Sequence, residues 1–270
     1  MKACAFEYAR PRDVAEAVKL IAEGGDDAKA MAGAQSMGPM LNLRVLQPKL
    51  VVDLRRIEEL RATQEAADSV TFGACVTHAE IEDGRVPDPT RGFMPEVASN
   101  IAYRAVRNRG TIGGSLVHAD PAADWPSTLL LLGASALIAG PDGRRELPIE
   151  KFLTGLFETA LKPGEILAGV RVPKLSAKAR RGYWKFCRKA GEFPQAIGGA
   201  LDDPDRGRAR AVIGATRSSA HLVADAKALI GKPDMGALLA AAGAADLGDD
   251  AYNRQLHAVA LRRAIERMAA

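Results

Sequence analysis

Two glycine-bearing segments carry the chemistry that the sequence most clearly suggests. The first reads Ala-Gly-Ala-Gln-Ser over residues 32–36, and the second reads Thr-Ile-Gly-Gly-Ser over residues 111–115. Small side chains let backbone N–H groups approach phosphate oxygens, and several N–H groups in one turn form a concave anion site. Together the two segments predict a two-sided cradle for a diphosphate.

Neither segment matches a common nucleotide-binding motif. The Gly-x-Gly-x-x-Gly pattern that follows a strand in dinucleotide-binding folds is missing, and neither segment ends in Gly-Lys-Ser/Thr. A single glycine-rich loop is most often a simple turn, whereas two such loops with these flanks favour a cofactor. The sequence therefore points to a rarer type of diphosphate-binding fold.

The first segment belongs to a small α/β unit that we expect over residues 1–57. Residues 11–22 have apolar side chains at helical spacing, with Asp13 placed to cap the helix and Gly24 and Gly25 placed to end it. Residues 28–32 are a strand candidate that runs into the first segment, and residues 50–54 are a second, β-branched strand candidate.

The second segment belongs to a further unit that we expect over residues 58–174. Strands are predicted at residues 70–74, 145–149 and 166–173, a capped helix start at residues 77–81, and a helix over residues 95–106 that leads into the second segment. The remaining residues, 175–270, combine a basic stretch around Trp184, a strand at 211–215 and alanine-rich helical periodicity, as in a small α/β cap. No long linker or repeat separates the three units.

Composition excludes several classes of protein. With 270 residues and 47% hydrophobic content, the chain can bury a substantial core in two or three domains. Glu7 follows the N-terminus too closely for a secretory signal, and no apolar run is long enough to span a bilayer, so we expect a cytoplasmic protein without a membrane span. A net charge of +4 and 5% aromatic residues disfavour nucleic acid as a partner.

The cysteines predict no metal site. Cys4, Cys75 and Cys187 have no Cys-x-x-Cys spacing, so this chain alone can build neither a structural zinc site nor an iron–sulfur cluster. We expect them to be small buried or half-buried residues. Any metal redox centre must therefore lie on a partner.

Histidines and carboxylates offer no convincing catalytic group. His78 and His118 could act as acid or base, but His118 is more simply a polar group beside the cofactor, and His221 and His257 are expected on the surface or in helices. Residues 202–207 have strong turn chemistry and predict a solvated hairpin rather than a cation site. The basic run at residues 174–189 fits either a solvated face or a cofactor or partner contact.

Longer motifs around both glycine segments resemble a known family. Residues 32–44 and 107–124, with residues 164–167 and 185–193, are similar to the FAD-binding medium subunits of the molybdenum hydroxylases, which include the carbon monoxide dehydrogenase medium chains and the xanthine dehydrogenase family. The resemblance covers essentially the whole chain. It implies an α+β protein with a PCMH-type FAD-binding fold: two α/β subdomains followed by a C-terminal α/β domain with an antiparallel sheet and helices.

The resemblance also implies which residues bind FAD. The two glycine segments would hold the pyrophosphate, Ile101 would lie beside the cofactor, Asp124 would be its polar partner, and Leu167 and Lys185 would line the cleft. The implied FAD-binding residues are Ala32, Gly33, Ala34, Gln35, Ser36, Met37, Ile101, Thr111, Ile112, Gly113, Gly114, Ser115, Asp124, Leu167, Lys185 and Phe193. No catalytic residue and no metal ligand is implied.

Two positions depart from the family pattern. Relatives often have Ala-Gly-Gly in the first loop, whereas this chain has Ala34, whose methyl group is tolerated at negative φ but clashes in the left-handed region. Relatives frequently place a tyrosine near the isoalloxazine where this chain has Phe193, which can cover a flavin face but cannot donate a hydrogen bond.

The resemblance implies an electron-transfer subunit. A large partner would hold molybdopterin and oxidise the substrate, a small partner would carry two [2Fe–2S] clusters, and this chain would pass electrons through FAD to an external acceptor. Relatives assemble as dimers of heterotrimers. Carbon monoxide, an aldehyde, a purine or another N-heterocycle stay open as substrates, and oxygen, quinone, a cytochrome and NAD stay open as acceptors.

Two other functions are compatible with the residues. The first is a self-sufficient FAD oxidoreductase that resembles the enolpyruvyl-glucosamine reductases, which would need an acid near the flavin. The second is an assembly scaffold that has lost FAD, and only Ala34 and Phe193 support this interpretation.

Overall fold

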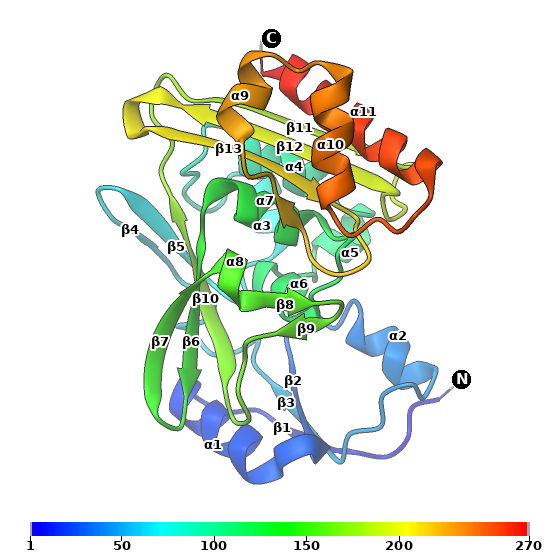
Figure 1. Ribbon diagram of the computed structural model, residues 1–270. Coiled ribbons are helices and arrows are strands. Elements are labelled where there is room, and N and C mark those ends of the chain that lie inside the picture. Colours follow the sequence, from blue (N-terminus) through cyan, green and yellow to red (C-terminus); the bar gives the residue numbers. More distant parts are fainter. Residues whose placement is uncertain (1, 269–270) are drawn as a thin grey trace.

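The computed structural model describes residues 2–268. Its elements form three parts stacked along the long axis of the molecule, with the N-terminal strands at the bottom of Figure 1 and the C-terminal helices at the top. The α+β fold is confirmed, and each of the three parts combines a sheet with helices.

The N-terminal part is a parallel sheet in the order β1-β3-β2. The Asp13 carboxylate accepts from the N–H of Glu16 at 2.8 Å and caps the first helix as predicted, and that helix buries Val14, Ala17, Val18 and Ile21. The elements of this part are β1 (Glu7–Ala9), α1 (Val14–Gly24), β2 (Ala28–Met31), α2 (Met37–Asn42) and β3 (Leu50–Asp53).

The middle part is an antiparallel sheet in the order β4-β5-β10-β6-β7, packed against helices. The largest fully buried side chains, including Trp125, Phe93 and Phe152, belong to this part. Its strands are β4 (Thr63–Glu65), β5 (Ser69–Gly73), β6 (Ser135–Gly140), β7 (Gly143–Pro148), β8 (Leu153–Gly155), β9 (Glu158–Thr159) and β10 (Ile166–Pro173). Its helices are α3 (His78–Glu82), α4 (Phe93–Ser99), α5 (Arg104–Arg107), α6 (Ile112–His118), α7 (Asp124–Leu132) and α8 (Ile149–Phe152).

The single helix predicted over residues 95–106 is wrong. It is two helices, α4 and α5, separated by residues 100–103, because Ala102 has a left-handed φ of 42°. The carbonyls of Ile101 and Ala102 accept hydrogen bonds from the Arg107 guanidinium instead of continuing a helix.

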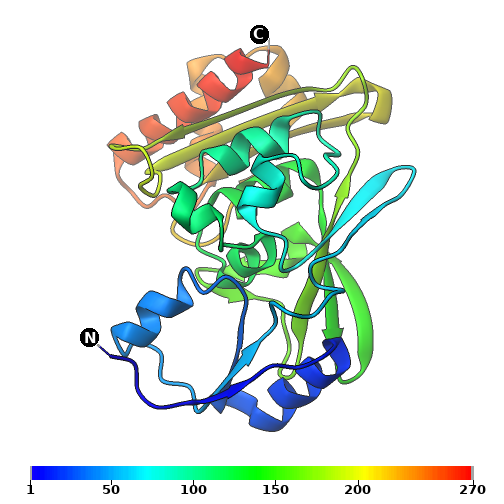
Figure 2. The same cartoon turned by 180° about the vertical axis from the view of Figure 1, so that it is seen from behind.

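The C-terminal part is an antiparallel sheet in the order β11-β12-β13-β14. Helices α9, α10 and α11 cover one face of the sheet, and Figure 2 shows helices of the middle part under the other face. Gly198 allows α11 to lie this close, because a Cβ there would be 2.5 Å from the backbone of Ala260. The elements are β11 (Arg180–Phe186), β12 (Ala196–Asp203), β13 (Arg208–Gly214), β14 (His221–Leu222), α9 (Ala226–Gly231), α10 (Met235–Ala244) and α11 (Ala251–Arg267).

Two predictions for polar residues of this part need correction. Residues 202–207 do connect β12 and β13 as a hairpin, but Asp203 is buried rather than solvated, and its carboxylate accepts from the N–H of Ser176 at 3.1 Å. His257 lies in α11 as one alternative had it, yet it is buried, with ring nitrogens 2.8 Å from the Asn253 carbonyl and 3.2 Å from the Ala215 carbonyl.

The described residues contain no group of three or more histidine, cysteine or carboxylate side chains placed to hold a metal ion. Cys75 is buried, and Cys4 and Cys187 are half-buried. Over the same residues, 2–268, the helices are all too short or too polar to cross a bilayer.

Candidate cofactor site

The two glycine segments lie against each other although they come from different parts of the fold. A Cβ on Gly33 would be 2.0 Å from the carbonyl oxygen of Arg109 and 2.8 Å from the Cα of Gly110. Backbone packs directly on backbone at this point, so only glycine fits at position 33. The contact joins the loop after β2 to the chain that leads into α6.

The first segment leaves its backbone N–H groups free. Within residues 2–268, none of the N–H groups of residues 32–36 donates a hydrogen bond to the protein. The Gln35 side chain donates to the carbonyl of Gly33 at 3.2 Å and braces the loop from within. Five consecutive unpaired donors in one loop fit an anion with several oxygens, such as a diphosphate.

Ala34 adopts the left-handed conformation that the sequence analysis identified as unfavourable for its methyl group. Its φ is 59°, where an L-residue costs about 1 kcal/mol relative to glycine. Ala34 still adopts the left-handed conformation, so the alanine in place of the glycine of the Ala-Gly-Gly pattern costs backbone strain.

The second segment uses its N–H groups inside the protein. Ile112 donates to the Val76 carbonyl and Gly113 to the Ala74 carbonyl, each at 3.0 Å. The Thr111 hydroxyl accepts from the N–H of Gly114 at 3.0 Å and caps α6. The N–H groups of Ile112, Gly113 and Gly114 are therefore not available to an anion, and the second segment can offer small side chains and the Ser115 hydroxyl.

His78 supports the second segment from the core. The backbone N–H of His78 donates to the Gly110 carbonyl at 2.9 Å, and its ring atom Nδ1 accepts from the indole N–H of Trp125 at 3.0 Å. Burial, with a smaller contribution from the nearby Arg107 cation, lowers the pKa of His78 to about 3. His78 is therefore neutral at physiological pH and is a structural hydrogen-bonding group.

Asp124 and Lys185 lie together, as members of one buried cluster. The Lys185 ammonium is 2.9 and 3.0 Å from the two Asp124 carboxylate oxygens, and the Tyr183 hydroxyl donates to the same carboxylate at 2.7 Å. Lys185 also donates to the carbonyl of Asn100 at 2.8 Å. Burial raises the pKa of Asp124, and the hydrogen bonds from Lys185 and Tyr183 oppose that effect.

The remaining predicted residues differ widely in exposure. Ile101 is half-buried next to the Asn100 carbonyl, and Met37 begins α2 directly after the first segment. Leu167 is only 3% exposed within the main core, so its side chain offers little surface to a ligand. Phe193, in the loop between β11 and β12, is 65% exposed. Leu167 shares the main core with Ile112 of the second segment, and its strand β10 contacts α6, whereas Phe193 lies on an exposed loop.

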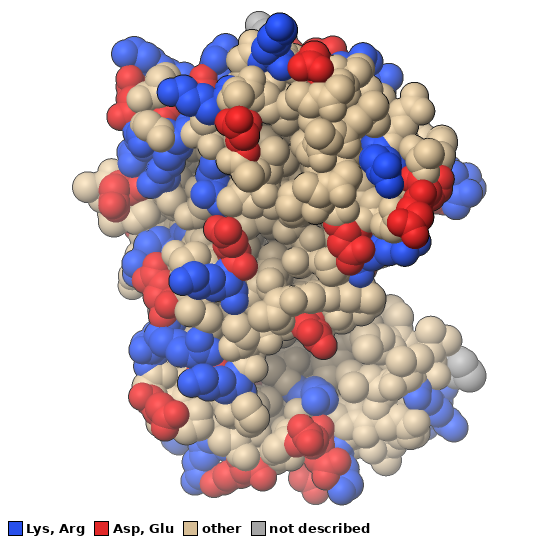
Figure 3. Space-filling model, in the orientation of Figure 1, with Lys and Arg blue, Asp and Glu red and all other residues tan. Residues whose placement is uncertain are grey.

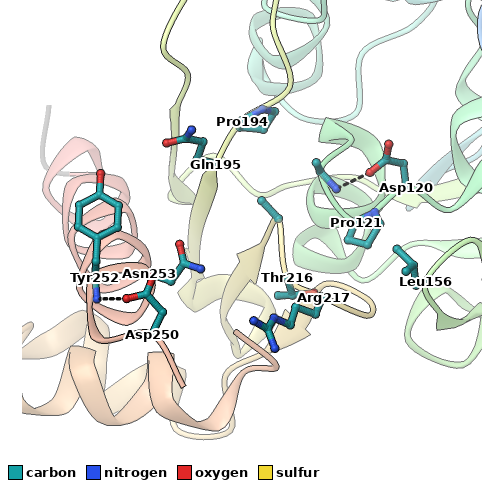
Figure 4. Close-up of a pocket in the computed structure, with 12 residues that line it drawn as sticks. Asp120, Pro121, Leu156, Pro194, Gln195, Thr216, Arg217, Asp250, Tyr252 and Asn253 are labelled. Carbon is teal, nitrogen blue, oxygen red and sulfur yellow. Dashed lines mark hydrogen bonds between the residues drawn. The ribbon is translucent and has the colours of Figure 1, made fainter. Parts of the chain in front are cut away.

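A recess separates the N-terminal part from the rest of the molecule. Figure 3 shows it on the side where Figure 1 places α2 and β9, lined mostly by uncharged side chains. A second hollow, a cavity of about 750 Å³, lies between the middle and C-terminal parts. Figure 4 shows Asp120, Pro194 and Asn253 among its lining residues, and none of the predicted FAD residues lines it.

Sequence reasoning missed three groups that shape the site. They are Asn100, Arg107 and Tyr183. The Asn100 carbonyl accepts from Lys185, Arg107 donates to the Ile101 carbonyl, and the Tyr183 hydroxyl donates to the Asp124 carboxylate. The Asn100 and Tyr183 contacts join residues 85 and 59 apart along the chain, and Arg107 is fixed by Glu82, 25 residues away, so local spacing does not reveal them.

Comparison with known proteins is consistent with this geometry. Residues 4–175 match the family model described as FAD binding domain in molybdopterin dehydrogenase. The chain is 38% identical over 200 residues to the 6-hydroxypseudooxynicotine dehydrogenase complex subunit alpha of Paenarthrobacter nicotinovorans, covering 74% of this chain and 67% of that protein. It is 32% identical to the carbon monoxide dehydrogenase medium chain of Afipia carboxidovorans, covering 97% and 96% of the two chains.

Solved structures match over the whole length. A chain of carbon monoxide dehydrogenase from Hydrogenophaga pseudoflava superposes with a TM-score of 0.91 at 31% identity, covering 100% of this chain and 99% of the other. A chain of quinoline 2-oxidoreductase from Pseudomonas putida 86 gives a TM-score of 0.86 at 31% identity, with the same coverage.

Proposed function

The chain belongs to the FAD-binding family of the molybdopterin dehydrogenases, as a medium subunit of the molybdenum hydroxylases, and from this premise we propose that it is their electron-transfer subunit. It accepts electrons from [2Fe–2S] clusters on a partner and passes them to an external acceptor. Bound FAD supplies the redox chemistry, and the protein supplies binding, orientation and control of access.

The observation that carries this proposal is the first glycine segment. Its five consecutive N–H groups, in residues 32–36, have no partner within residues 2–268 and fit the oxygens of the FAD pyrophosphate. Gly33 fixes this loop against the chain that precedes Thr111, so that the two segments form one wall. Gly114 of the second segment is exposed and lies next to Ala32, and because it has no side chain it leaves room for a ligand there.

The protein's own groups support a role without acid–base catalysis. His78 is buried and neutral, and the Asp124 carboxylate is fully engaged by Lys185 and Tyr183. A self-sufficient reductase would need an acid near the flavin. The buried, mutually bonded state of these groups favours a subunit whose substrate chemistry takes place elsewhere.

The partners follow from the relatives. Proteins that this chain resembles are named as medium chains or subunits of dehydrogenase complexes. We therefore propose a large molybdopterin-binding subunit and a small [2Fe–2S] subunit as partners, assembled as a dimer of heterotrimers in the cytoplasm. In this proposal the two partners hold the metal centres.

Co-expression with the neighbouring genes tests the proposal. The complex is purified by a tag on this chain, and its visible spectrum is recorded beside a denaturing gel. Flavin and iron–sulfur absorption with two co-purifying chains is the expected result. Flavin on a lone polypeptide that oxidises or reduces a small substrate would overturn the electron-transfer role, and a purified complex without flavin would overturn the FAD assignment.

A further inference from the structure

Three consecutive backbone carbonyls at one turn accept hydrogen bonds from side-chain cations. The carbonyl of Asn100 accepts from Lys185 at 2.8 Å, and the carbonyls of Ile101 and Ala102 accept from Arg107 at 3.0 and 3.2 Å. We call residues 100–102 the clamped turn. Ala102 has a φ of 42°, so the turn is held in a conformation that an alanine does not adopt without support.

Each of the two cations is itself anchored by a carboxylate. Lys185 bonds both oxygens of the buried Asp124, and Arg107 bonds both oxygens of Glu82 at 2.7 and 2.9 Å. Such charge-assisted, two-point contacts fix the direction of a long side chain. The cations are therefore rigid supports for the carbonyls rather than mobile surface charges.

The two supports reach the clamped turn from different parts of the protein. Arg107 belongs to α5 in the middle part, whereas Lys185 belongs to β11 in the C-terminal part. The turn thus depends on the C-terminal part for its first carbonyl and on the middle part for the next two. Ile101, which the family resemblance places beside FAD, lies between them.

Lys185 already bonds two acceptor groups. Its ammonium nitrogen is 2.9 and 3.0 Å from the two Asp124 oxygens, which one N–H can share, and 2.8 Å from the Asn100 carbonyl oxygen. The side chain is only 14% exposed, so it offers little surface to a ligand. Its main contribution to a cofactor site is therefore made through the Asn100 carbonyl.

We propose that Lys185 is a positioning residue, which holds the clamped turn so that Ile101 faces the bound FAD and couples the cofactor site to the C-terminal part. This inference rests on the proposed FAD-binding function. The family resemblance implies that Lys185 contacts FAD directly. In our proposal Lys185 acts on FAD through the clamped turn, as Arg107 does.

A double-mutant cycle on FAD affinity tests the inference in the complete chain. The first variant is Lys185→Met with Asp124→Asn, which leaves no uncompensated buried charge, the second is Arg107→Met, and the third combines both. If both cations act through one turn, each of the first two raises the Kd for FAD about tenfold and the combination raises it hardly further. Independent direct contacts would instead give about a hundredfold increase for the combination, and would overturn the inference.

A spectroscopic readout and a matched control complete the test. Lys178→Met removes an exposed lysine that pairs with Asp205 at 3.1 Å, and it leaves the Kd unchanged. The visible circular dichroism of bound flavin changes in the first two variants, because Ile101 moves against the ring, and it stays constant in the control. An unchanged flavin spectrum in both variants overturns the inference. Failure of the wild-type chain to bind FAD counts against the proposed function instead.

Discussion

The two glycine segments are both rich in small residues but use their backbones in opposite ways. The N–H groups of residues 32–36 have no partner among the residues that the structure describes, whereas those of Ile112, Gly113 and Gly114 are paired with carbonyl or hydroxyl oxygens of the protein. The first segment therefore keeps donors available for a ligand, whereas the second uses its donors to hold the fold. Substitutions in the first segment should therefore act mainly on ligand affinity, and substitutions in the second mainly on the stability of the apoprotein.

The largest effect is expected where the two segments meet. Gly33→Ala places a methyl group 2.0 Å from the Arg109 carbonyl oxygen, so the loop must move away from the second segment. We expect a loss of about 3 kcal/mol in stability and loss of FAD from the purified protein. The flavin-to-protein ratio and the urea midpoint measure these two effects.

Gly38→Ala is the matched control for this variant. Within residues 2–268, no atom lies within 4 Å of a Cβ at position 38, which is in α2, so the substitution should keep the flavin content and raise the stability slightly, by about 0.5 kcal/mol. A Gly33→Ala protein that retains stoichiometric FAD would show that contact between the segments is not needed for binding.

The second segment should respond to pH through His78. The folded pKa of His78 is about 3, below its ordinary value of 6.5, so the unfolded chain takes up a proton that the folded chain refuses. Stability from this group is complete above pH 6.5 and falls as the pH drops toward 3. Between pH 7 and pH 5 we expect it to contribute a loss of about 2 kcal/mol, measured as the free energy of unfolding in urea.

His78→Asn isolates this contribution. The asparagine side-chain oxygen can accept the hydrogen bond from Trp125 in place of Nδ1, but it does not titrate. The variant is less stable than the wild type at pH 7 because it leaves space in the core, and its loss on acidification is smaller. Parallel pH profiles for the two proteins would contradict the assignment of a neutral buried histidine.

A smaller effect distinguishes the caps of the two segments. Thr111→Ala removes the hydroxyl that accepts from the N–H of Gly114 and should cost about 1 kcal/mol in the apoprotein. Ser36 stands at the start of α2 but makes no cap hydrogen bond, so Ser36→Ala should change stability by less than about 0.5 kcal/mol. Thermal unfolding of both apoproteins measures the difference, and equal shifts would refute the contrast between the segments.

Much of this fold follows from local patterns in the sequence. The Asp13 cap, the Thr77 capping box and the strand over Ile166–Pro173 all lie where side-chain spacing predicted them. These features depend on residues within one turn or one strand, and sequence neighbours suffice to specify them. The break between α4 and α5 depends instead on Arg107, whose support for residues 101 and 102 comes from a tertiary arrangement.

The site could be predicted only in part for the same reason. Small side chains in residues 32–36 predicted a phosphate-binding loop, and the N–H groups of this loop have no partner within residues 2–268. The pairing of the second segment with Ala74 and Val76 was not predictable, because identical glycines can present N–H groups outward or inward. FAD contacts of the individual residues stay predictions.

The smallest effect concerns Ala34, whose φ of 59° places backbone strain in the first loop. Ala34→Gly removes about 1 kcal/mol of left-handed strain and adds about 0.5 kcal/mol of backbone entropy to the unfolded chain. The net expectation is a gain of about 0.5 kcal/mol in apoprotein stability, read from urea unfolding, with an unchanged Kd for FAD. Ala32→Gly, two positions earlier and without positive φ, should lose at least about 0.5 kcal/mol, because it adds the same entropy cost and removes a methyl group that packs against the core. If both variants lose stability equally, residue 34 is not left-handed in solution, and the loop presents its N–H groups differently from the arrangement argued here.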